Sequence, residues 1–279
     1  MSVSDFIKRH SVPLFFMLTF VWFWGWMTCY FVLTPGESIF ELSPTFLLFF
    51  YVGGTAPSLM GIVLTRVLDR EKGSETLFGL LRLWRVKPFW YVVALFTSPI
   101  LLNLTLVIVW ILGVRIGGEF VTSYLVAGIP LGLSAGLMEE FGWRGFALPR
   151  LQARYTALDA TLIMGLLWGV WHIYPSIWVN AASMGALIIP VAILGGPVEM
   201  TAYAILMTWV LNNTRGSLAM AILMHASFTA SQIIFLPVLS AVDSLWIGGV
   251  FSALLWLMVV IVVAATGPKR LAREAVLAE

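Results

Sequence analysis

The chain has 279 residues, of which 60% are hydrophobic and 11% are charged, and its mean hydropathy is +0.96. Soluble domains carry about 25% charged residues, so this composition excludes an ordinary soluble domain and predicts an all-α, polytopic membrane protein in a lipid bilayer. The net charge of +2 gives no reason to expect a nucleic-acid partner, and a single cysteine, Cys29, excludes an intrachain disulfide and a thiolate metal site.

Eight stretches are long and apolar enough to cross a bilayer as helices, which takes about 20 residues each. The fourth contains Pro130. The sixth contains Pro190, the sequence GGP at 195–197 and Glu199, so it is either broken or re-entrant, and a total of seven or nine helices stays open. We interpret residues 1–279 as one membrane domain. The predicted segments are roughly 12–34, 44–65, 89–113, 121–147, 158–179, 184–211, 217–237 and 244–266.

Basic residues predict how these helices are oriented. They concentrate in alternate loops, and such loops lie in the cytoplasm in most membrane proteins. The loops assigned to the opposite side of the membrane contain one basic residue, Arg115, and the acidic residues Glu37, Glu41, Glu119 and Asp243. We therefore expect both termini in the cytoplasm and, by default for a compact chain of this kind, a prokaryotic plasma membrane. The basic residues assigned to the cytoplasmic side are Lys8, Arg9, Arg66, Arg70, Lys72, Arg82, Arg85, Lys87, Arg150, Arg154, Arg215, Lys269, Arg270 and Arg273.

The longest basic loop, residues 66–88, ends in a sequence that mixes aromatic and basic residues, LFGLLRLWRVKPFW at 77–90. This mixture is typical of an amphipathic helix at the membrane interface. A solvated loop with interface anchors explains it as well as a lipid- or substrate-binding role does.

Ionisable residues at membrane depth are rare and usually functional. Glu140 and Arg144 are four residues apart and can form an ion pair on one helix face. Glu139 points about 100° away, and its neighbours at i±3 and i±4 carry no positive charge. A carboxylate left in apolar surroundings binds a proton more tightly than in water, which suits it to act as a general base; a bond to the backbone of another helix is the structural alternative. Those neighbours are Ala135, Gly136, Gly142 and Trp143.

Small residues predict close helix packing beside the acidic pair and beside the first of two intramembrane histidines. Gly128, Gly132 and Gly136 share a stripe with Glu140, and Gly165 and Gly169 form a similar face in the fifth segment.

The two intramembrane histidines lie on such packed faces. His172 follows Trp168 by four residues, so the indole would cover the imidazole. His225 lies on a stripe of small and polar residues that faces the bundle interior. Each histidine alone is better explained as a satisfied core residue than as a catalyst. The stripe is Ser217, Ala221, His225 and Thr229.

Depth connects three of these residues. At ~1.5 Å per residue, Glu139, His172 and His225 lie roughly 14, 17–23 and 14 Å from the cytoplasmic ends of their helices. A Glu and two His in one slab, reachable from the cytoplasm, could bind Zn²⁺ with a position left for water. Alternatively, the Glu could deprotonate water while a histidine stabilises the oxyanion. Both are hydrolytic chemistries, although the chain has no H-E-x-x-H and no G-x-S-x-G sequence.

The sequences EEFGWR (139–144), WGVWH (168–172) and TRGSLAMAILMHASFT (214–229) resemble, in order, the EExxxR, FxxxH and HxxxN motifs of the CPBP family of intramembrane proteases. This family includes CAAX prenyl endopeptidases of the Rce1 type and bacterial relatives linked to bacteriocin self-immunity. The resemblance covers about residues 121–236, which would form the catalytic core.

The resemblance implies a role for each residue. Glu139 would be the base that activates water, His172 would hold and polarise that water, and His225 would bind the scissile carbonyl oxygen. Glu140 and Arg144 would support them. The family is named as metalloproteases, yet its Rce1-type members look able to work without a metal, so no cofactor and Zn²⁺ both stay open. The substrate would be a membrane-associated peptide or protein, prenylated in the Rce1-type case.

The chain departs from the motifs at two positions. Trp168 replaces the Phe of the second motif, and an aromatic cover remains. Thr229 replaces the Asn of the third, whose amide would help to form an oxyanion site worth ~3 kcal/mol per donor. Either Thr229 substitutes through water, or Gln232 on about the same face reaches in, or activity is reduced. Glu199 has no role in the motifs; a helix start near the interface explains it better than substrate entry does.

We therefore predict an intramembrane endopeptidase, of glutamate or metallo type, whose active site opens to the cytoplasmic side. Two alternatives belong to other classes. One is a non-catalytic relative that binds or protects a membrane partner, which Thr229 favours. The other is a small proton-coupled transporter that uses the same buried groups as a relay. A transporter would be supported by an inverted repeat, and the sequence contains none that we detect.

Overall fold

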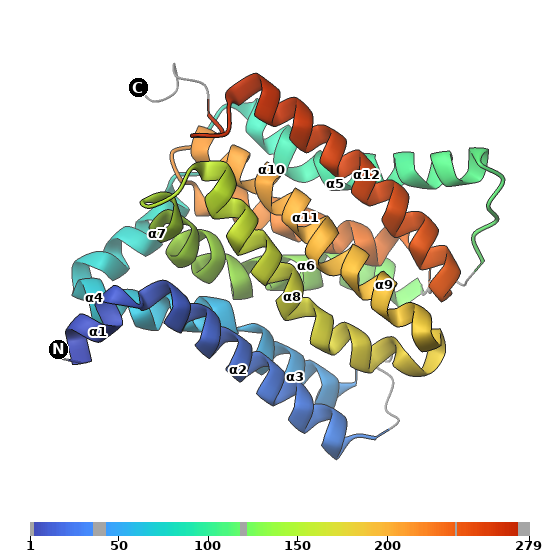
Figure 1. Cartoon of the computed structure of the whole chain (residues 1–279), viewed down its shortest axis with the longest axis horizontal. Helices are drawn as coiled ribbons and strands as arrows, with labels where there is room; N and C mark the ends of the chain where they lie inside the picture. Colours follow the sequence, from blue (N-terminus) through green and yellow to red (C-terminus); the bar gives the residue numbers. More distant parts are fainter. Residues whose placement is uncertain (1–2, 36–42, 118–121, 238, 273–279) are drawn as a thin grey trace.

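The computed structural model describes residues 3–35, 43–117, 122–237 and 239–272, and over these residues the protein is a bundle of α-helices (Figure 1). The predicted fold class, an all-α polytopic membrane protein, is confirmed. Within the described residues, seven stretches are long and apolar enough to cross a membrane. They are Ser11–Leu33, Pro44–Arg82, Pro88–Ile111, Ala157–Trp178, Gly185–Asn213, Leu218–Phe235 and Ala241–Thr266.

All eight predicted segments fall on long helices or on helix pairs. The fourth, which carries the acidic pair, is helical but is not one of the seven apolar stretches. Two short helices, α1 (Val3–Arg9) and α7 (Leu148–Gln152), lie outside the spans. The long elements are α2 (Ser11–Leu33), α3 (Pro44–Gly54) with α4 (Ala56–Gly79), α5 (Pro88–Ile111), α6 (Thr122–Gly142), α8 (Ala157–Met184), α9 (Ile188–Ile193) with α10 (Glu199–Asn213), α11 (Leu218–Phe235) and α12 (Ala241–Thr266).

Irregular turns in the helices follow the sequence in part. The sixth segment is a continuous helical stretch, Gly185–Asn213, and is not broken: a π-helical turn, η5 (Leu194–Val198), contains the GGP sequence and joins α9 to α10 without a gap. Pro130, in contrast, lies inside α6 without ending it. A second π-helical turn, η3 (Trp143–Ala147), follows the acidic pair. Such turns are rare and are frequent at functional sites.

The prediction of a loop at residues 66–88 is wrong for the first part of this range. Residues 66–79 continue α4, and the chain turns within this helix at Arg70, whose φ is 56°. Polar residues with good helix propensity occupy this stretch, so the loss of hydropathy marks the end of the apolar span and not the end of the helix.

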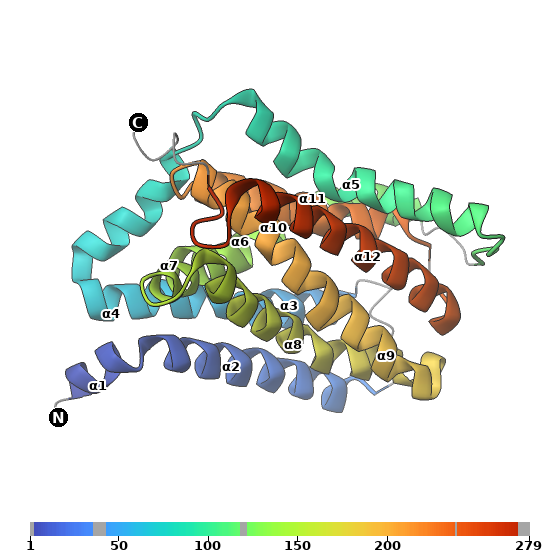
Figure 2. The same ribbon diagram turned by 45° about the horizontal axis from the view of Figure 1, so that its top comes forward.

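Contacts between loops confirm that the basic segments share one end of the bundle. Nη2 of Arg150 lies 2.6 Å from Oδ2 of Asp69, and Nη2 of Arg215 donates to the Arg85 carbonyl at 3.4 Å. The amide of Asn212 donates to the carbonyl of Arg270. Helices α1 and α7, the later part of α4 and the last turns of α12 (Ala241–Thr266) lie at this end in Figures 1 and 2. We call it the basic end. Of the charges used for the orientation, Glu37, Glu41, Glu119 and Arg273 lie outside the described residues.

The glycine stripe of α6 packs against α11, and this is the most extensive helix pairing in the bundle. A methyl group added at Gly132 would lie 2.4 Å from the carbonyl oxygen of Ala226, and one at Gly136 would lie 2.7 Å from that of Ile222. At Gly128 it would meet a side chain of α11 at 2.5 Å. The two backbones approach this closely only because glycine has no Cβ, and the contact brings the acidic pair of α6 to His225 on α11.

The glycine face of α8 packs in the same way against η5 and α10. A methyl group at Gly165 would lie 2.9 Å from Cα of Thr201, and one at Gly169 would lie 2.5 Å from Pro197. Close packing predicted from the sequence is therefore confirmed on both helices. It holds the part of α8 that carries His172 against η5 and α10.

Candidate active site

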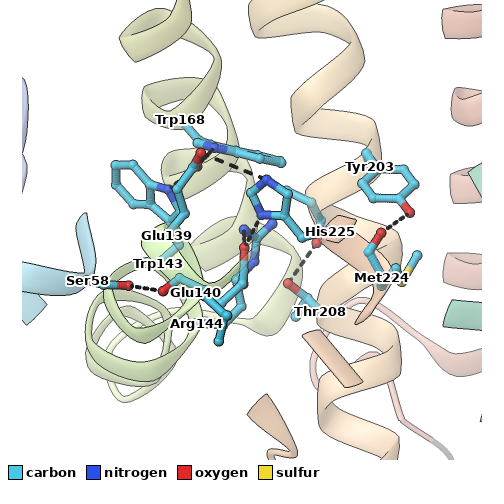
Figure 3. A network of polar contacts seen from close by, with 12 residues as sticks. Ser58, Glu139, Glu140, Trp143, Arg144, Trp168, Tyr203, Thr208, Met224 and His225 are labelled. Carbon is cyan, nitrogen blue, oxygen red and sulfur yellow. Dashed lines mark hydrogen bonds and ion pairs between the residues drawn. The ribbon is translucent and has the colours of Figure 1, made fainter. Parts of the chain in front are cut away.

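Side chains of α6, α8 and α11 meet at the site: Trp168 of α8 contacts both Glu139 of α6 and His225 of α11 (Figure 3). The acidic pair ends α6, Arg144 lies in η3, and the two histidines come from α8 and α11. Four of these side chains are almost completely removed from the surface. The exposed fractions are 5% for Glu139, 0% for Glu140, 1% for Arg144 and 2% for His225.

Glu140 joins Arg144 to His225 through one oxygen. Nη1 of Arg144 donates to Oε1 of Glu140 at 2.8 Å, which confirms the predicted i,i+4 ion pair. The same oxygen lies 2.7 Å from Nδ1 of His225. Because a carboxylate only accepts, Nδ1 carries the proton and the ring presents Nε2 on its other side. The sequence predicted the ion pair but not that Glu140 also orients His225.

Glu139 is not unpaired, and that expectation is wrong. Its Oε2 accepts the indole N–H of Trp143 at 3.0 Å and that of Trp168 at 2.8 Å. Trp143 is the i+4 neighbour of Glu139. It carries no charge, but its indole N–H is a hydrogen-bond donor. The remaining oxygen, Oε1, lies 3.9 Å from Nε2 of His225. This separation exceeds a hydrogen bond and suits a water molecule held by both atoms.

Trp168 contacts Glu139, Arg144 and both histidines. The guanidinium carbon of Arg144 lies 4.6 Å from the centre of its ring. The ring also meets His225 and His172 edge to face, with centroids 5.3 and 5.9 Å away. The sequence predicted the contact with His172. The hydrogen bond to Glu139 and the cation–π contact were missed, because helix spacing carries no information about contacts between helices.

His172 is held by its own helix. Its Nδ1 lies 3.0 Å from the carbonyl oxygen of Trp168, which only accepts, so the proton is again on Nδ1 and Nε2 is left for other partners. Trp171 packs edge to face against the ring at 4.7 Å. The side chain is half-buried and faces a cavity that Glu139 also lines.

This cavity has a volume of about 380 Å³, within the range of small-molecule sites, and we call it the active-site cavity. The polar residues on its wall are Glu139, His172, Ser176 and Asn180. Most of the remaining wall is aromatic or aliphatic, including Phe23, Met27, Phe46, Phe50, Trp171 and Met200. A long apolar group with a polar end fits this lining.

The active-site cavity leads away from the basic end. Beyond Glu139 and His172 its wall is formed by Asn180 late in α8, Phe46 in the first turn of α3 and Val191 of α9. Helix α9 lies at the end of the bundle opposite α1 and α7 (Figure 1).

The basic side of Glu139 is packed with aromatic side chains. Trp143 lies 5.3 Å from Phe15, which lies 5.3 Å from Phe146, and all three are fully buried. The active-site cavity therefore lies on the other side of Glu139, whereas the sequence predicts an opening toward the cytoplasm; the side from which substrate enters stays a prediction. Helix spacing fixed the depth of the residues but not the side on which neighbouring helices leave space.

Thr229 lies one turn after His225 on α11 and is half-buried. Within the described part of the chain its side chain makes no hydrogen bond. Gln232, the alternative donor, gives its amide N–H to Oε1 of Glu199 at 2.9 Å. Gln232 is therefore engaged at a separate place, and no amide takes the place of the motif's Asn beside His225 in this arrangement.

A metal site built on Glu139, His172 and His225 is not preformed. Among the residues that the structure describes, no group of three or more His, Cys, Asp or Glu side chains is arranged to hold a metal ion. The residues therefore do not fit Zn²⁺ in this arrangement, and no step below depends on it.

Comparison with known proteins identifies the region that holds the site. Residues 121–231 match the family described as type II CAAX prenyl endopeptidase Rce1-like. The matched region, which is less than half of the chain, is similar to this family. The chain is also 30% identical, over 118 residues, to a CAAX prenyl protease 2 of Methanococcus maripaludis. That alignment covers 42% of this chain and 43% of the relative, so the chain spans less than half of the relative's length. The matched region contains every site residue named above except Gln232 and the side chains of α2 and α3.

We predict that Glu140→Gln destabilises the protein by about 3–5 kcal/mol, because the buried charge of Arg144 loses its counter-charge. Thermal or denaturant unfolding of the purified protein in detergent measures this. Adding Arg144→Met should restore most of the loss, since no buried charge is left without a partner. Glu71→Gln is the control: it breaks an ion pair with Arg66 in which both side chains are more than half exposed, worth less than about 1 kcal/mol. Equal effects of Glu140→Gln and Glu71→Gln would contradict the proposed balance of charges.

Proposed function

We propose that the protein is an intramembrane endopeptidase that hydrolyses a peptide bond with water activated by Glu139. The observation that carries this proposal is the 3.9 Å gap between Oε1 of Glu139 and Nε2 of His225, close to a cavity that Glu139 and His172 line. A water in that gap has an acceptor for its proton on one side. The matched family and the name of the relative support a peptidase.

The chemistry divides between the two oxygens of Glu139. The two indole donors hold Oε2, which leaves Oε1 to accept a proton from water. The oxygen of that water attacks the carbonyl carbon, and the proton on Glu139 then passes to the departing amine, so charge and protons balance. His172, with Nε2 facing the active-site cavity, accepts a hydrogen bond from the attacking water and orients it.

His225 stabilises the oxyanion in this proposal. With Nδ1–H given to Glu140, the ring donates from Nε2 only as the doubly protonated imidazolium. Glu139 and Glu140 lie on its two sides and balance the positive charge. Glu140 and Arg144 thus act as positioning residues. Thr229, one turn away, adds a hydroxyl donor through water where the family motif has an amide.

The substrate that fits is a lipidated peptide or protein in the membrane. An apolar wall of aromatic and Met side chains suits a hydrocarbon chain, and the polar residues at its inner end suit the peptide. The relative's name contains "prenyl", which makes a prenylated C-terminus the first substrate to test. A non-catalytic protein that binds such a partner is the second candidate, and Thr229 is the observation that favours it.

We predict that Glu139→Gln lowers kcat by at least about 100-fold, because the amide accepts the indole hydrogen bonds but cannot take a proton. Purified protein and a panel of prenylated, acylated and unlipidated peptides test this, with Glu71→Gln as the control that leaves kcat unchanged. Cleavage that survives Glu139→Gln would exclude this residue as the base. Cleavage that is lost on stringent chelation and restored by Zn²⁺ would support the metal route instead.

The variant Thr229→Asn should raise kcat by up to about 100-fold with little change in KM, because an amide beside His225 adds a direct oxyanion donor. Thr229→Val, which matches the shape of Thr without the hydroxyl, should lower kcat. Steady-state kinetics on one cleaved peptide measures both. If both variants cleave at the rate of the parent protein, Thr229 has no part in the reaction. If neither variant cleaves any peptide, the non-catalytic candidate is favoured.

We further propose that the basic end faces the cytoplasm, in a prokaryotic plasma membrane, because basic loops are retained on that side. Cys29→Ser gives a chain without cysteine, into which Arg270→Cys or Gly117→Cys is introduced. A membrane-impermeant maleimide should label Gly117→Cys in intact cells and Arg270→Cys only after lysis, since both positions are exposed at opposite ends. The reverse pattern would overturn this orientation.

A further inference from the structure

Glu199 is a buried carboxylate that the proposed reaction does not use. It begins α10 directly after the π-helical turn η5, and 6% of it is exposed. Its Oε1 accepts the amide of Gln232 on α11 at 2.9 Å. In the described part of the chain, no Lys, Arg or His forms an ion pair with it.

A second cavity contains this carboxylate. It has a volume of about 270 Å³ and lies between α9, η5 and α10 on one side and α11 and α12 on the other. The polar side chains on its wall are Glu199, Gln232 and Ser244. Phe228 and Phe251 are among the apolar residues that make up the rest. The wall combines a small group of acceptors with a long apolar surface.

The second cavity borders the active-site cavity. Val191, Gly195 and Met200 line both. Gly195 presents no side chain, and a Met side chain is unbranched and easily rearranged. These three residues therefore form a wall that the two cavities share.

The charge of Glu199 needs a partner. A buried carboxylate with one neutral donor is unfavourable unless it takes a proton or meets a cation. A cation from a ligand satisfies both the charge and the second oxygen. Lysine fits better than arginine, because its compact ammonium needs few acceptors and its aliphatic stem can lie along apolar side chains. A guanidinium would bring five donors to a site with few acceptors.

We propose that Glu199, held by Gln232, is a specificity site that binds a lysine side chain of the polypeptide in the active-site cavity. The identity of this ligand rests on the proposed peptidase function. The site itself rests on the buried carboxylate and on the wall shared by the two cavities. It selects substrates by charge, whereas the active-site cavity selects them by apolar bulk.

Binding to the full chain carrying Glu139→Gln tests this without cleavage. The probes are prenylated peptides in which one lysine is moved along the sequence, each paired with a peptide that has norleucine there. At one position lysine should lower Kd at least about tenfold relative to norleucine, because the ammonium has a buried counter-charge. Adding Glu199→Gln should abolish this preference and leave the norleucine Kd unchanged, which also reports that the variant is folded. Glu71→Gln is the matched control that keeps the preference.

The proposal is overturned if no position shows a lysine preference in the protein with Glu199 intact, a comparison that needs no substitution at Glu199. It is also overturned if the preference persists in Glu199→Gln. These results are distinct from failure of the proposed function. A lysine preference that depends on Glu199, in a protein that cleaves none of the peptides when Glu139 is present, would count against the peptidase and leave the binding site standing. Normal cleavage without the preference would reject the site alone.

Discussion

The buried charge of Arg144 is the constraint on which the rest of the site depends. Nε and Nη2 have no hydrogen-bond partner among the described residues, so Glu140 and the face of Trp168 supply most of the stabilisation of this guanidinium. A charge without water requires a partner in a fixed position. Because Glu140 is fixed by Arg144, its Oε1 also fixes the ring of His225. The same indole that covers Arg144 donates to Glu139. One buried cation therefore determines where both Nε2 of His225 and Oε1 of Glu139 lie.

Helix packing supplies the other half of this arrangement. The pair of acids on α6 meets His225 only because Gly132 and Gly136 let the backbone of α11 approach. Gly169 does the same for α8 and the turn η5. In a membrane the hydrophobic effect does not drive helices together, so close backbone packing and buried polar contacts carry more of the association. The glycines and the buried charges therefore depend on each other, since the charges are compensated only at this helix separation.

The sequence predicted what depends on periodicity and composition, and it missed what depends on contacts between helices. Apolar length identified the spans, and spacing of four identified the Glu140–Arg144 pair. Arg70 shows one limit: α4 continues beyond the apolar span because hydropathy and helix formation end at different residues. Trp143 and Trp168 show a second limit: helix spacing identifies charged partners and finds none for Glu139, whereas both donors in the structure are uncharged indoles. The direction of the active-site cavity was also missed, because it depends on which side chains of α2, α3 and α9 leave space.

The two departures from the family motifs act on different parts of the proposed reaction. Trp168, where the motif has Phe, adds an indole donor to Glu139. Thr229, where the motif has Asn, weakens direct donation to the oxyanion in the proposed reaction. This second change makes the proposed reaction depend more strongly on the donor at Nε2 of His225. The position of that atom is set by Glu140, and through Glu140 by Arg144. In the proposed reaction Arg144, a residue without contact to substrate, thereby positions the oxyanion donor, which gives the second acid and the arginine of the EExxxR motif a role beside the proposed base, Glu139.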